Sequence, residues 1–532
     1  MSSAAPGSGP CSEAAADLPA MSERAETPVS TMPKRSYGEI LKSSALIGGS
    51  AAFNMAFGII RTKVMALLLG PSGIGLIGVY TSIAELARGI AGLGIKSSGV
   101  RQIAEAVGTG DTQKIARTVT TLRRVAFYSG ASGAMLLALL AKPIAKISFG
   151  DYERAGAVAM LALVVFFMDI SEAQAALVQG MRRIADLARM SVLGALYGTV
   201  FSIVIVFFFR EPGLVPSLVC VAFMSIVTSW WYARKVRIEK AKVSFSEVWE
   251  EASSLVKLGV IFMTSALTMQ ASGYLVRMIV LREIGINEAG YYQAAWALGG
   301  IYISFILSAM AADFYPRLTG VAQRNPDCNQ LVNEQAEVGL LMAGPGILGT
   351  LTFAPLVITL FYRSDFGPAA AVLRWICLGM LMRVITWPMA FILLAKGERK
   401  LYFWSEILSN SAYVALVWAA VKAFGLPGTG IGFFGVNVCY YVGIYIISRR
   451  LTGFRWSRES LRLMATFAPL VAAVFVAGCF LSTWWAAVAG LLITIPASFY
   501  SLKVLCRLLP FDRLPRPVQK LLRLLKFNVG TG

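Results

Sequence analysis

The sequence predicts an all-α, polytopic membrane protein with about 14 transmembrane helices, in two six-helix lobes around a central cavity plus two C-terminal helices. Three observations predict this class. Hydrophobic residues make up 57% of the 532 residues and charged residues only 15%, and the mean hydropathy is +0.66. Lys and Arg gather in every second loop between apolar segments. A short motif also recurs in the two halves of the chain.

The chain opens with residues 1–37, which are rich in Ala, Ser, Pro and Glu and contain no apolar run. This composition predicts a disordered cytoplasmic tail and not a signal peptide. We expect the N-terminal lobe at 38–237, the C-terminal lobe at 238–450, helices 13 and 14 at 451–509, and a basic tail at 510–532.

The first two spans form a hairpin, Ser43–Leu69 and Ile74–Gly99, joined by a Gly-Pro-Ser-Gly turn. Each exceeds the roughly 20 residues that cross a bilayer. Charged residues nevertheless lie inside both, and they are Arg61, Lys63, Glu85 and Arg88. A charge at bilayer depth costs about 2.5–3.5 kcal/mol, so it usually faces a cavity or a partner. Asn54 and Arg61 share one helical face, and Lys63 lies on another, where we expect it to extend outward. We interpret the hairpin as the lining of an aqueous, cationic cavity.

Further apolar segments continue to the end of the chain. We predict spans at about Thr121–Leu140, Ala155–Val178, Met190–Phe209, Gly213–Trp231, Leu255–Val280, Gly290–Ala312, Val338–Phe361, Ala370–Ala395, Leu401–Phe424, Gly430–Ile447, Leu463–Leu481 and Trp484–Leu505.

The loops set the predicted orientation. The side that includes Lys34, Arg35 and the cluster Lys503–Lys526 carries most of the loop Lys and Arg residues. By the positive-inside rule both termini are therefore cytoplasmic. The stretch Arg513–Lys526 mixes leucines with basic residues and is expected to lie on the anionic leaflet. The net charge of +20 is thus a topology signal and predicts no nucleic-acid partner.

The recurring motif is a G-x4-G turn. It occurs at Gly70–Gly75 and again at Gly285–Gly290, and Arg61 and Arg277 lie near the outer ends of the two preceding helices. An even number of spans separates the copies, so they have the same orientation. This predicts two lobes related by an axis along the membrane normal, with the substrate cavity between them.

Residue usage limits the chemistry. The chain has no histidine, and its seven cysteines form no C-x-x-C pair, so we predict no metal site, no disulfide framework and no cofactor. Any coupled proton must then use carboxylates. The carboxylates at membrane depth are Glu85, Asp169, Glu172, Asp313 and Glu406. We assign this role first to Glu85 and Asp313, and a simple counter-ion is the alternative for each of the five, since Glu85 for example lies three residues from Arg88.

The stretch Phe57–Gly75 (FGIIRTKVMALLLGPSGIG) resembles the first hairpin of Wzx-type polysaccharide flippases of the multidrug/oligosaccharidyl-lipid/polysaccharide exporter superfamily. Ala311–Leu318 and Leu394–Lys400 extend the resemblance, which covers about Tyr37–Arg450. It implies a bacterial inner-membrane protein that moves undecaprenyl-diphosphate-linked oligosaccharide to the periplasmic leaflet. The pathway would be O-antigen lipopolysaccharide or exopolysaccharide biosynthesis, with a polymerase and a chain-length regulator as partners.

Arg61 and Arg88 look like arginines that related lipid II flippases use in their cavity. Arginine binds phosphate oxygens through a planar fork and stays charged, so we predict that Arg61, Arg88, Arg277 and Arg383 bind the diphosphate. For each, the alternative is a structural arginine near a helix end.

The chain also departs from those flippases. Thr62 replaces an aspartate, and the stretch Tyr291–Trp296 replaces an arginine of helix 8. We predict a polar and aromatic lining from Asn54, Tyr292 and Trp296. Aromatic rings at helix starts are usually interface anchors, and stacking on the sugar rings of the cargo is the alternative for Tyr292 and Trp296.

Two other functions compete with the flippase. A cation-coupled multidrug exporter would share the fold but favours an acidic cavity, whereas this hairpin is basic. A glycan polymerase or glycosyltransferase needs a sizeable extracytoplasmic domain, and the longest outer loop is only about Ala141–Glu153. The sequence therefore predicts a transporter and not an enzyme.

Overall fold

The computed structural model describes residues 34–236, 238 and 245–508 of the chain, and within them the secondary structure is helical, without a β-strand. Helix α1 already begins at Lys34, inside the tail predicted over residues 1–37. Residues 1–33 and the basic segment from residue 510 lie outside the described residues, so the predictions made for them stay predictions.

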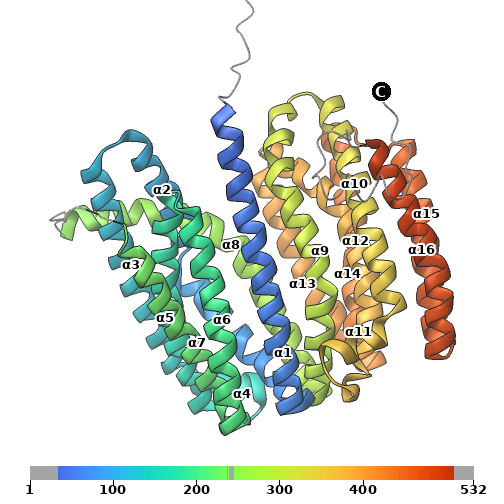
Figure 1. Cartoon of the computed structure of the whole chain (residues 1–532), viewed down its shortest axis with the longest axis horizontal. Helices are drawn as coiled ribbons and strands as arrows, with labels where there is room; N and C mark the ends of the chain where they lie inside the picture. Colours follow the sequence, from blue (N-terminus) through green and yellow to red (C-terminus); the bar gives the residue numbers. More distant parts are fainter. Residues whose placement is uncertain (1–33, 237, 239–244, 509–532) are drawn as a thin grey trace, which may run out of the picture. The chain divides into compact units, whose positions relative to one another are not determined.

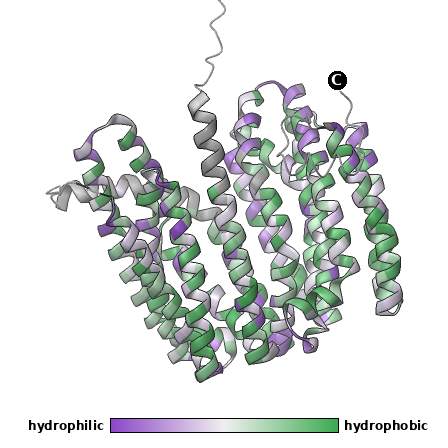
Figure 2. Cartoon of the chain, viewed as in Figure 1, coloured by the Kyte–Doolittle hydropathy of each residue, from purple (hydrophilic) through white to green (hydrophobic). Residues whose placement is uncertain are grey.

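The elements of the N-terminal half are α1 (Lys34–Ala91), α2 (Ile95–Thr109), α3 (Thr112–Leu139), α4 (Ala141–Phe149), α5 (Ala155–Gly180), α6 (Ile184–Phe209), η1 (Glu211–Gly213) and α7 (Leu214–Ala233). Those of the C-terminal half are α8 (Phe245–Glu283), α9 (Ile286–Val321), α10 (Asn325–Thr352), α11 (Ala354–Phe361), η2 (Ser364–Phe366), α12 (Ala369–Ala395), α13 (Arg399–Phe424), α14 (Pro427–Thr452), α15 (Arg458–Phe480) and α16 (Thr483–Leu508). Apolar residues cover most of the helices, and hydrophilic residues gather toward helix ends (Figure 2).

The protein is a multi-pass membrane protein. Nine described helices are long and apolar enough to cross a bilayer, or up to 12 if each of three bent pairs is one span. The bent pairs include α3 with α4, at 61°, and α10 with α11, at 81°. Helix α1 breaks at Gly70, whose φ is 65°, and so contains both arms of the predicted hairpin. If α1 counts as two spans and α8 as a further one, the upper count of 12 becomes 14, the number predicted.

The helices pack in two groups (Figure 1). Helices α2–α7 contact one another, mainly through α3 with α5, α5 with α7, and α6 with α7. Helix α1 belongs to the same N-terminal group, because Thr199 of α6 donates a hydrogen bond to the carbonyl oxygen of Phe57 and Arg88 pairs with Glu172 of α5. Helices α9–α14 form the second group around α12, and α8 contacts members of both groups. Helices α15 and α16 pack on α10. This grouping agrees with the predicted all-helical architecture, whereas the predicted boundaries of the two lobes and a central cavity between them remain predictions.

The two G-x4-G turns lie against each other. A Cβ atom added to Gly75 would stand 2.5 Å from the carbonyl oxygen of Ile286 and 2.9 Å from the backbone nitrogen of Gly290. A Cβ atom on Gly290 would overlap the carbonyl oxygen of Pro71. Real Cβ atoms essentially never approach other heavy atoms within 3.0 Å, so only glycine permits this contact. The repeat therefore joins the two groups backbone to backbone.

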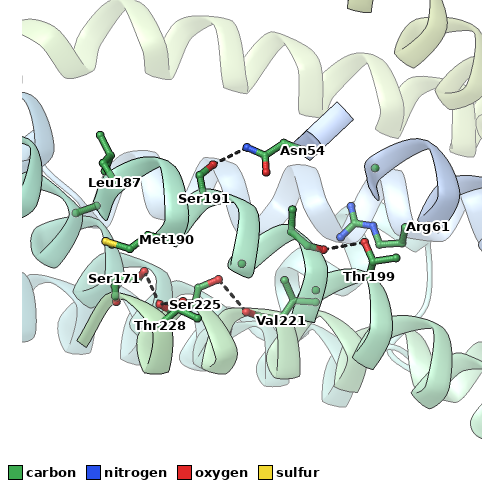
Figure 3. Close-up of a pocket in the computed structure, with 16 residues that line it drawn as sticks. Asn54, Arg61, Ser171, Leu187, Met190, Ser191, Thr199, Val221, Ser225 and Thr228 are labelled. Carbon is green, nitrogen blue, oxygen red and sulfur yellow. Dashed lines mark hydrogen bonds between the residues drawn. The ribbon is translucent and has the colours of Figure 1, made fainter. Parts of the chain in front are cut away.

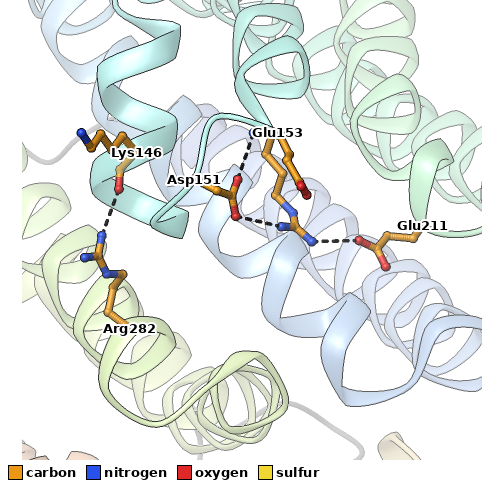
Figure 4. Close-up of polar contacts among 6 residues, drawn as sticks. Lys146, Asp151, Glu153, Glu211 and Arg282 are labelled. Carbon is orange, nitrogen blue, oxygen red and sulfur yellow. Dashed lines mark hydrogen bonds and ion pairs between the residues drawn. The ribbon is translucent and has the colours of Figure 1, made fainter.

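Polar contacts close the same end of the molecule. Lys63 donates a hydrogen bond to the carbonyl oxygen of Thr359, at 2.9 Å, and another to that of Tyr362. Arg282 donates to the carbonyl oxygens of Lys146 and Ile147, at 2.9 Å each (Figure 4). The prediction that Lys63 extends outward is wrong, because uncapped carbonyls near the end of α11 accept its ammonium protons.

Candidate functional site

Four helices of the N-terminal group, α1, α5, α6 and α7, enclose a cavity of about 450 Å³ (Figure 3). This volume lies in the usual range of small-molecule sites. Its lining is rich in small and hydroxyl-bearing residues, and the hydroxyl groups come from Ser171, Ser191, Thr199, Ser225, Thr228 and Ser229. The space is inside one helix group, and it is not the cavity between lobes that the sequence predicted.

Arg61 is the charged residue of this cavity. Its side chain is partly buried, and no acidic side chain lies within ion-pair distance of it among the described residues. No acidic residue lines the cavity in the described part of the chain. Removing a guanidinium from water is costly unless an anion accompanies it. A cation left without its anion in a polar cavity is an arrangement suited to an anionic ligand.

Asn54 also lines this cavity, from the same arm of α1 as Arg61. Its Nδ2 donates to Ser191 Oγ at 2.5 Å, while its Oδ1 is buried and has no hydrogen-bond partner (Figure 3). Most lining hydroxyls donate to backbone carbonyls, as Thr199 does to Ala195 at 2.8 Å and Ser225 to Val221 at 2.9 Å. Their oxygens therefore remain able to accept hydrogen bonds, which suits a ligand that carries hydroxyl groups.

Arg88 lies outside this cavity. It forms an ion pair with Glu172 of α5, and Lys96 Nζ lies 3.7 Å from the same carboxylate. The interpretation of Glu85 as the counter-ion of Arg88 is wrong, because Arg88 extends toward α5 and not along its own helix. Glu85 is exposed and forms no ion pair with any other described residue.

The other two predicted arginines lie in the C-terminal group. Arg277 of α8 donates through Nε to Gln293 Oε1 at 2.9 Å and also to the carbonyl oxygen of Gly273 at 3.0 Å. Arg383 of α12 is exposed. Neither lines the cavity that contains Arg61. The structure thus places the four predicted diphosphate residues at separate positions, and only Arg61 and Asn54 share a cavity.

The aromatic candidates belong to a packed cluster. Tyr292 is only 1% exposed, and its hydroxyl lies 3.2 Å from that of Tyr413. Trp296 stacks on Tyr413 and meets Phe433 edge to face, with ring centroids 5.2 Å apart. In this conformation Tyr292 cannot stack on a sugar ring. A partly buried Trp296 retains some exposed surface.

Of the proton-coupling candidates, Asp313 is exposed and forms an ion pair with Arg317 at 3.1 Å. Sequence reasoning missed the hydroxyl set of the cavity and the pairing of Arg88 with Glu172. A helical projection of α5 could have found the second, because Asp169 and Glu172 are three residues apart inside an apolar segment.

Comparisons with known proteins agree with this architecture. Residues 64–371, more than half of the chain, match a family described as polysaccharide biosynthesis protein. The lipid III flippase of Escherichia coli K12 is 20% identical over 419 residues, which cover 77% of this chain and 99% of that protein.

Two solved structures share the fold. The lipid II flippase MurJ, in an inward closed conformation, aligns with a TM-score of 0.66 at 12% identity, over 87% of this chain and 99% of that one. An inward-facing multidrug resistance transporter of the MATE family aligns with a TM-score of 0.61 at 16% identity, over 78% and 96% of the chains. The exporter-superfamily resemblance inferred from the sequence is confirmed.

Proposed function

The chain belongs to the family of polysaccharide biosynthesis proteins, and from that premise we propose that it is a flippase for an oligosaccharide carried on a lipid diphosphate. The observation that carries the proposal is Arg61, a cation with no counter-ion among the described residues, in a cavity rich in hydroxyl groups. A lipid diphosphate brings two or more negative charges, and its first sugars bring hydroxyl groups. The cavity offers a partner for each, since Arg61 matches the phosphate oxygens and Asn54 Oδ1 matches a hydroxyl proton.

The resemblance to polysaccharide flippases supports a more specific proposal for the cargo and its direction. We propose undecaprenyl diphosphate as the carrier, transport from the cytoplasmic to the periplasmic leaflet of a bacterial inner membrane, and cytoplasmic termini. O-antigen or exopolysaccharide assembly would consume the product, with a polymerase and a chain-length regulator next in the pathway. Arg88, Arg277 and Arg383 would contact the diphosphate at other stages of the cycle, since they lie apart from Arg61.

A multidrug exporter of the same superfamily is less well supported. Exporters of cations need negative charge where the drug binds. Here no carboxylate lines the cavity among the described residues, and its one charged residue is an arginine. A cationic drug would meet repulsion from Arg61, so the charge of the cavity favours an anionic cargo.

The proposal predicts that a short polyprenyl diphosphate stabilises the purified full-length chain. Farnesyl diphosphate should raise the melting temperature in proportion to the logarithm of its concentration, because a ligand that binds the folded state adds RT ln(1 + [L]/Kd) to stability. The uncharged alcohol farnesol, at equal concentration, is the control for the lipid tail, and ethidium is the control for a cationic drug. Equal shifts with farnesol and farnesyl diphosphate, or a larger shift with ethidium, would contradict the proposal.

A further inference from the structure

Two carboxylates of α5 lie within electrostatic reach of the guanidinium of Arg88, and one of them binds it. Asp169 and Glu172 are three residues apart and so lie on one face of the helix. Glu172 forms the ion pair with Arg88 and is also 3.7 Å from Lys96 of α2. The charges of Arg88 and Glu172 both act on Asp169, which forms no ion pair with Arg88 or any other described residue. Arg88 therefore has two carboxylates of α5, Asp169 and Glu172, as potential partners.

Asp169 is buried without a partner. The residue is 5% exposed, and its Oδ2 is enclosed with no hydrogen-bond partner among the described residues. The Nε of Arg88 is likewise buried and unpartnered. Two glycines enclose the carboxyl group, since Cβ atoms added to Gly92 and Gly130 would each lie 3.6 Å from one of its oxygens. A buried carboxylate oxygen without a donor is costly, and either a proton or Arg88 removes that cost.

Few charges act on Asp169. They are Arg88 from α1 and Glu172 from its own helix, while Lys96 from α2 reaches only Glu172. The other helices packed on α5, namely α3, α4, α6 and α7, bring no charged side chain close enough to act on it among the described residues. Helix α7 contacts α5 through an uncharged group, the carbonyl of Ser225, which accepts a hydrogen bond from Ser171 at 3.1 Å. The protonation of Asp169 therefore depends on where Arg88 is.

We propose that Asp169 and Glu172 compete with the diphosphate of the cargo for Arg88, and that Asp169 takes up a proton from solvent when the diphosphate wins. The proposal rests on the proposed function, because it needs an anionic cargo. When Arg88 pairs with phosphate, two carboxylates remain with Lys96 alone, and an O–H bond on Asp169 restores the balance of charge. The proton-binding site of the cycle is then Asp169, whereas Glu85 and Asp313 are both exposed.

Thermodynamic linkage gives the sign of the pH dependence. If binding of the anion brings a proton with it, a lower pH favours the anion, and affinity rises by up to about tenfold for each pH unit lost. The Asp169→Asn variant has no carboxylate to protonate. It should bind the diphosphate more tightly than wild type at about pH 8, with little dependence on pH.

The test is isothermal titration of the full-length chain in nanodiscs with farnesyl diphosphate as the probe. Repeating the titration at about pH 8 in two buffers of different ionisation enthalpy gives the number of protons taken up. We expect roughly one proton per diphosphate in wild type and close to none in Asp169→Asn. The matched control is Asp186→Asn, which removes a buried carboxylate of α6 that pairs with Arg183 at 2.7 Å, and it should keep the wild-type proton uptake.

The outcomes separate the two claims. A wild-type chain that binds the probe without proton uptake overturns the competition and leaves the proposed function standing. A wild-type chain that does not bind the probe overturns both. If Asp169→Asn fails to fold, Glu172→Gln is the alternative variant. It releases Arg88 from its ion pair and should therefore bind the diphosphate severalfold more tightly. Unchanged or weaker binding would contradict competition between the carboxylates and the diphosphate.

Discussion

Replacing Arg61 with alanine should abolish surface polysaccharide while the protein stays at its normal level in the membrane. Charge-assisted hydrogen bonds are worth about 1.5–3 kcal/mol, so their loss lowers affinity for the diphosphate about 10- to 150-fold. Arg61 forms no ion pair in the described structure, and its removal therefore leaves no buried carboxylate unpaired. Folding should survive the change, and lipid-linked units should accumulate in the membrane.

Two further variants give this prediction its controls. Arg61→Lys should restore transport only in part, because a lysine ammonium is a point charge without the planar fork. Arg154→Ala removes an arginine of the same helix group that pairs with Asp151 and Glu211 outside the cavity (Figure 4). It should transport normally. Normal polysaccharide in cells with Arg61→Ala would show that the cavity cation does not bind the cargo.

Replacing Gly290 with valine should also stop transport, by preventing closure where the two glycine turns meet. The added Cβ would overlap the carbonyl oxygen of Pro71, and backbone cannot move aside as a flexible side chain can. Overpacking typically costs about 1–3 kcal/mol, enough to shift an equilibrium between closed and open states about 5- to 150-fold. The closed state should become rare, and the carrier should no longer alternate.

Thiol labelling reports this shift directly. Gly194 lines the cavity, and a Cβ added there meets nothing within 4 Å, so Gly194→Cys introduces a probe in a chain whose native cysteines are replaced. An impermeant maleimide added on the side of the glycine turns should label it faster in the Gly290→Val background. The control is Gly443→Val in α14, where an added Cβ also meets nothing. Unchanged transport and unchanged labelling in Gly290→Val would show that transport does not require closure at the contact between the two glycine turns.

The helical membrane fold could be predicted from the sequence because membrane-spanning helices require long apolar segments, which are easy to recognise. Long apolar segments predict the spans, and the G-x4-G repeat predicts two related helix groups. The structure adds a reason for the repeat, since Gly75 and Gly290 meet across the groups. The prediction of Arg61 and Asn54 on one face also holds, because a helical period places them in the same cavity.

Side-chain partners were harder to predict because they depend on contacts between helices. A spacing of three residues suggested Glu85 as the partner of Arg88, yet such surface pairs are worth only about 0.2–0.5 kcal/mol, and Glu172 across the helix contact prevails. Lys63 and Tyr292 show the same limitation. Periodicity placed each on a face, but it could not show that backbone carbonyls bind Lys63 or that Tyr413 covers Tyr292.

The charge of the cargo also bears on the driving force. Each charge that crosses the membrane field is worth about 2.3 kcal/mol per 100 mV, so two negative charges that move outward from an inside-negative compartment gain roughly 4–5 kcal/mol. A proton that travels on Asp169 would return about half of this gain. On the proposed function, the membrane potential should therefore be a net drive for export, and a smaller one than the diphosphate alone would give.

Transfer of a lipid diphosphate between leaflets is the central claim, and reconstitution tests it most directly. The full-length chain is placed in liposomes with a polyprenyl diphosphate that carries a fluorescent sugar, and an impermeant quencher reports which leaflet the headgroup occupies. We predict transfer that depends on the protein, speeds up under an inside-negative potential at equal pH, and is lost in Arg61→Ala. If the diphosphate lipid moves no faster than in protein-free liposomes, or equally fast with Arg61→Ala, the account is wrong.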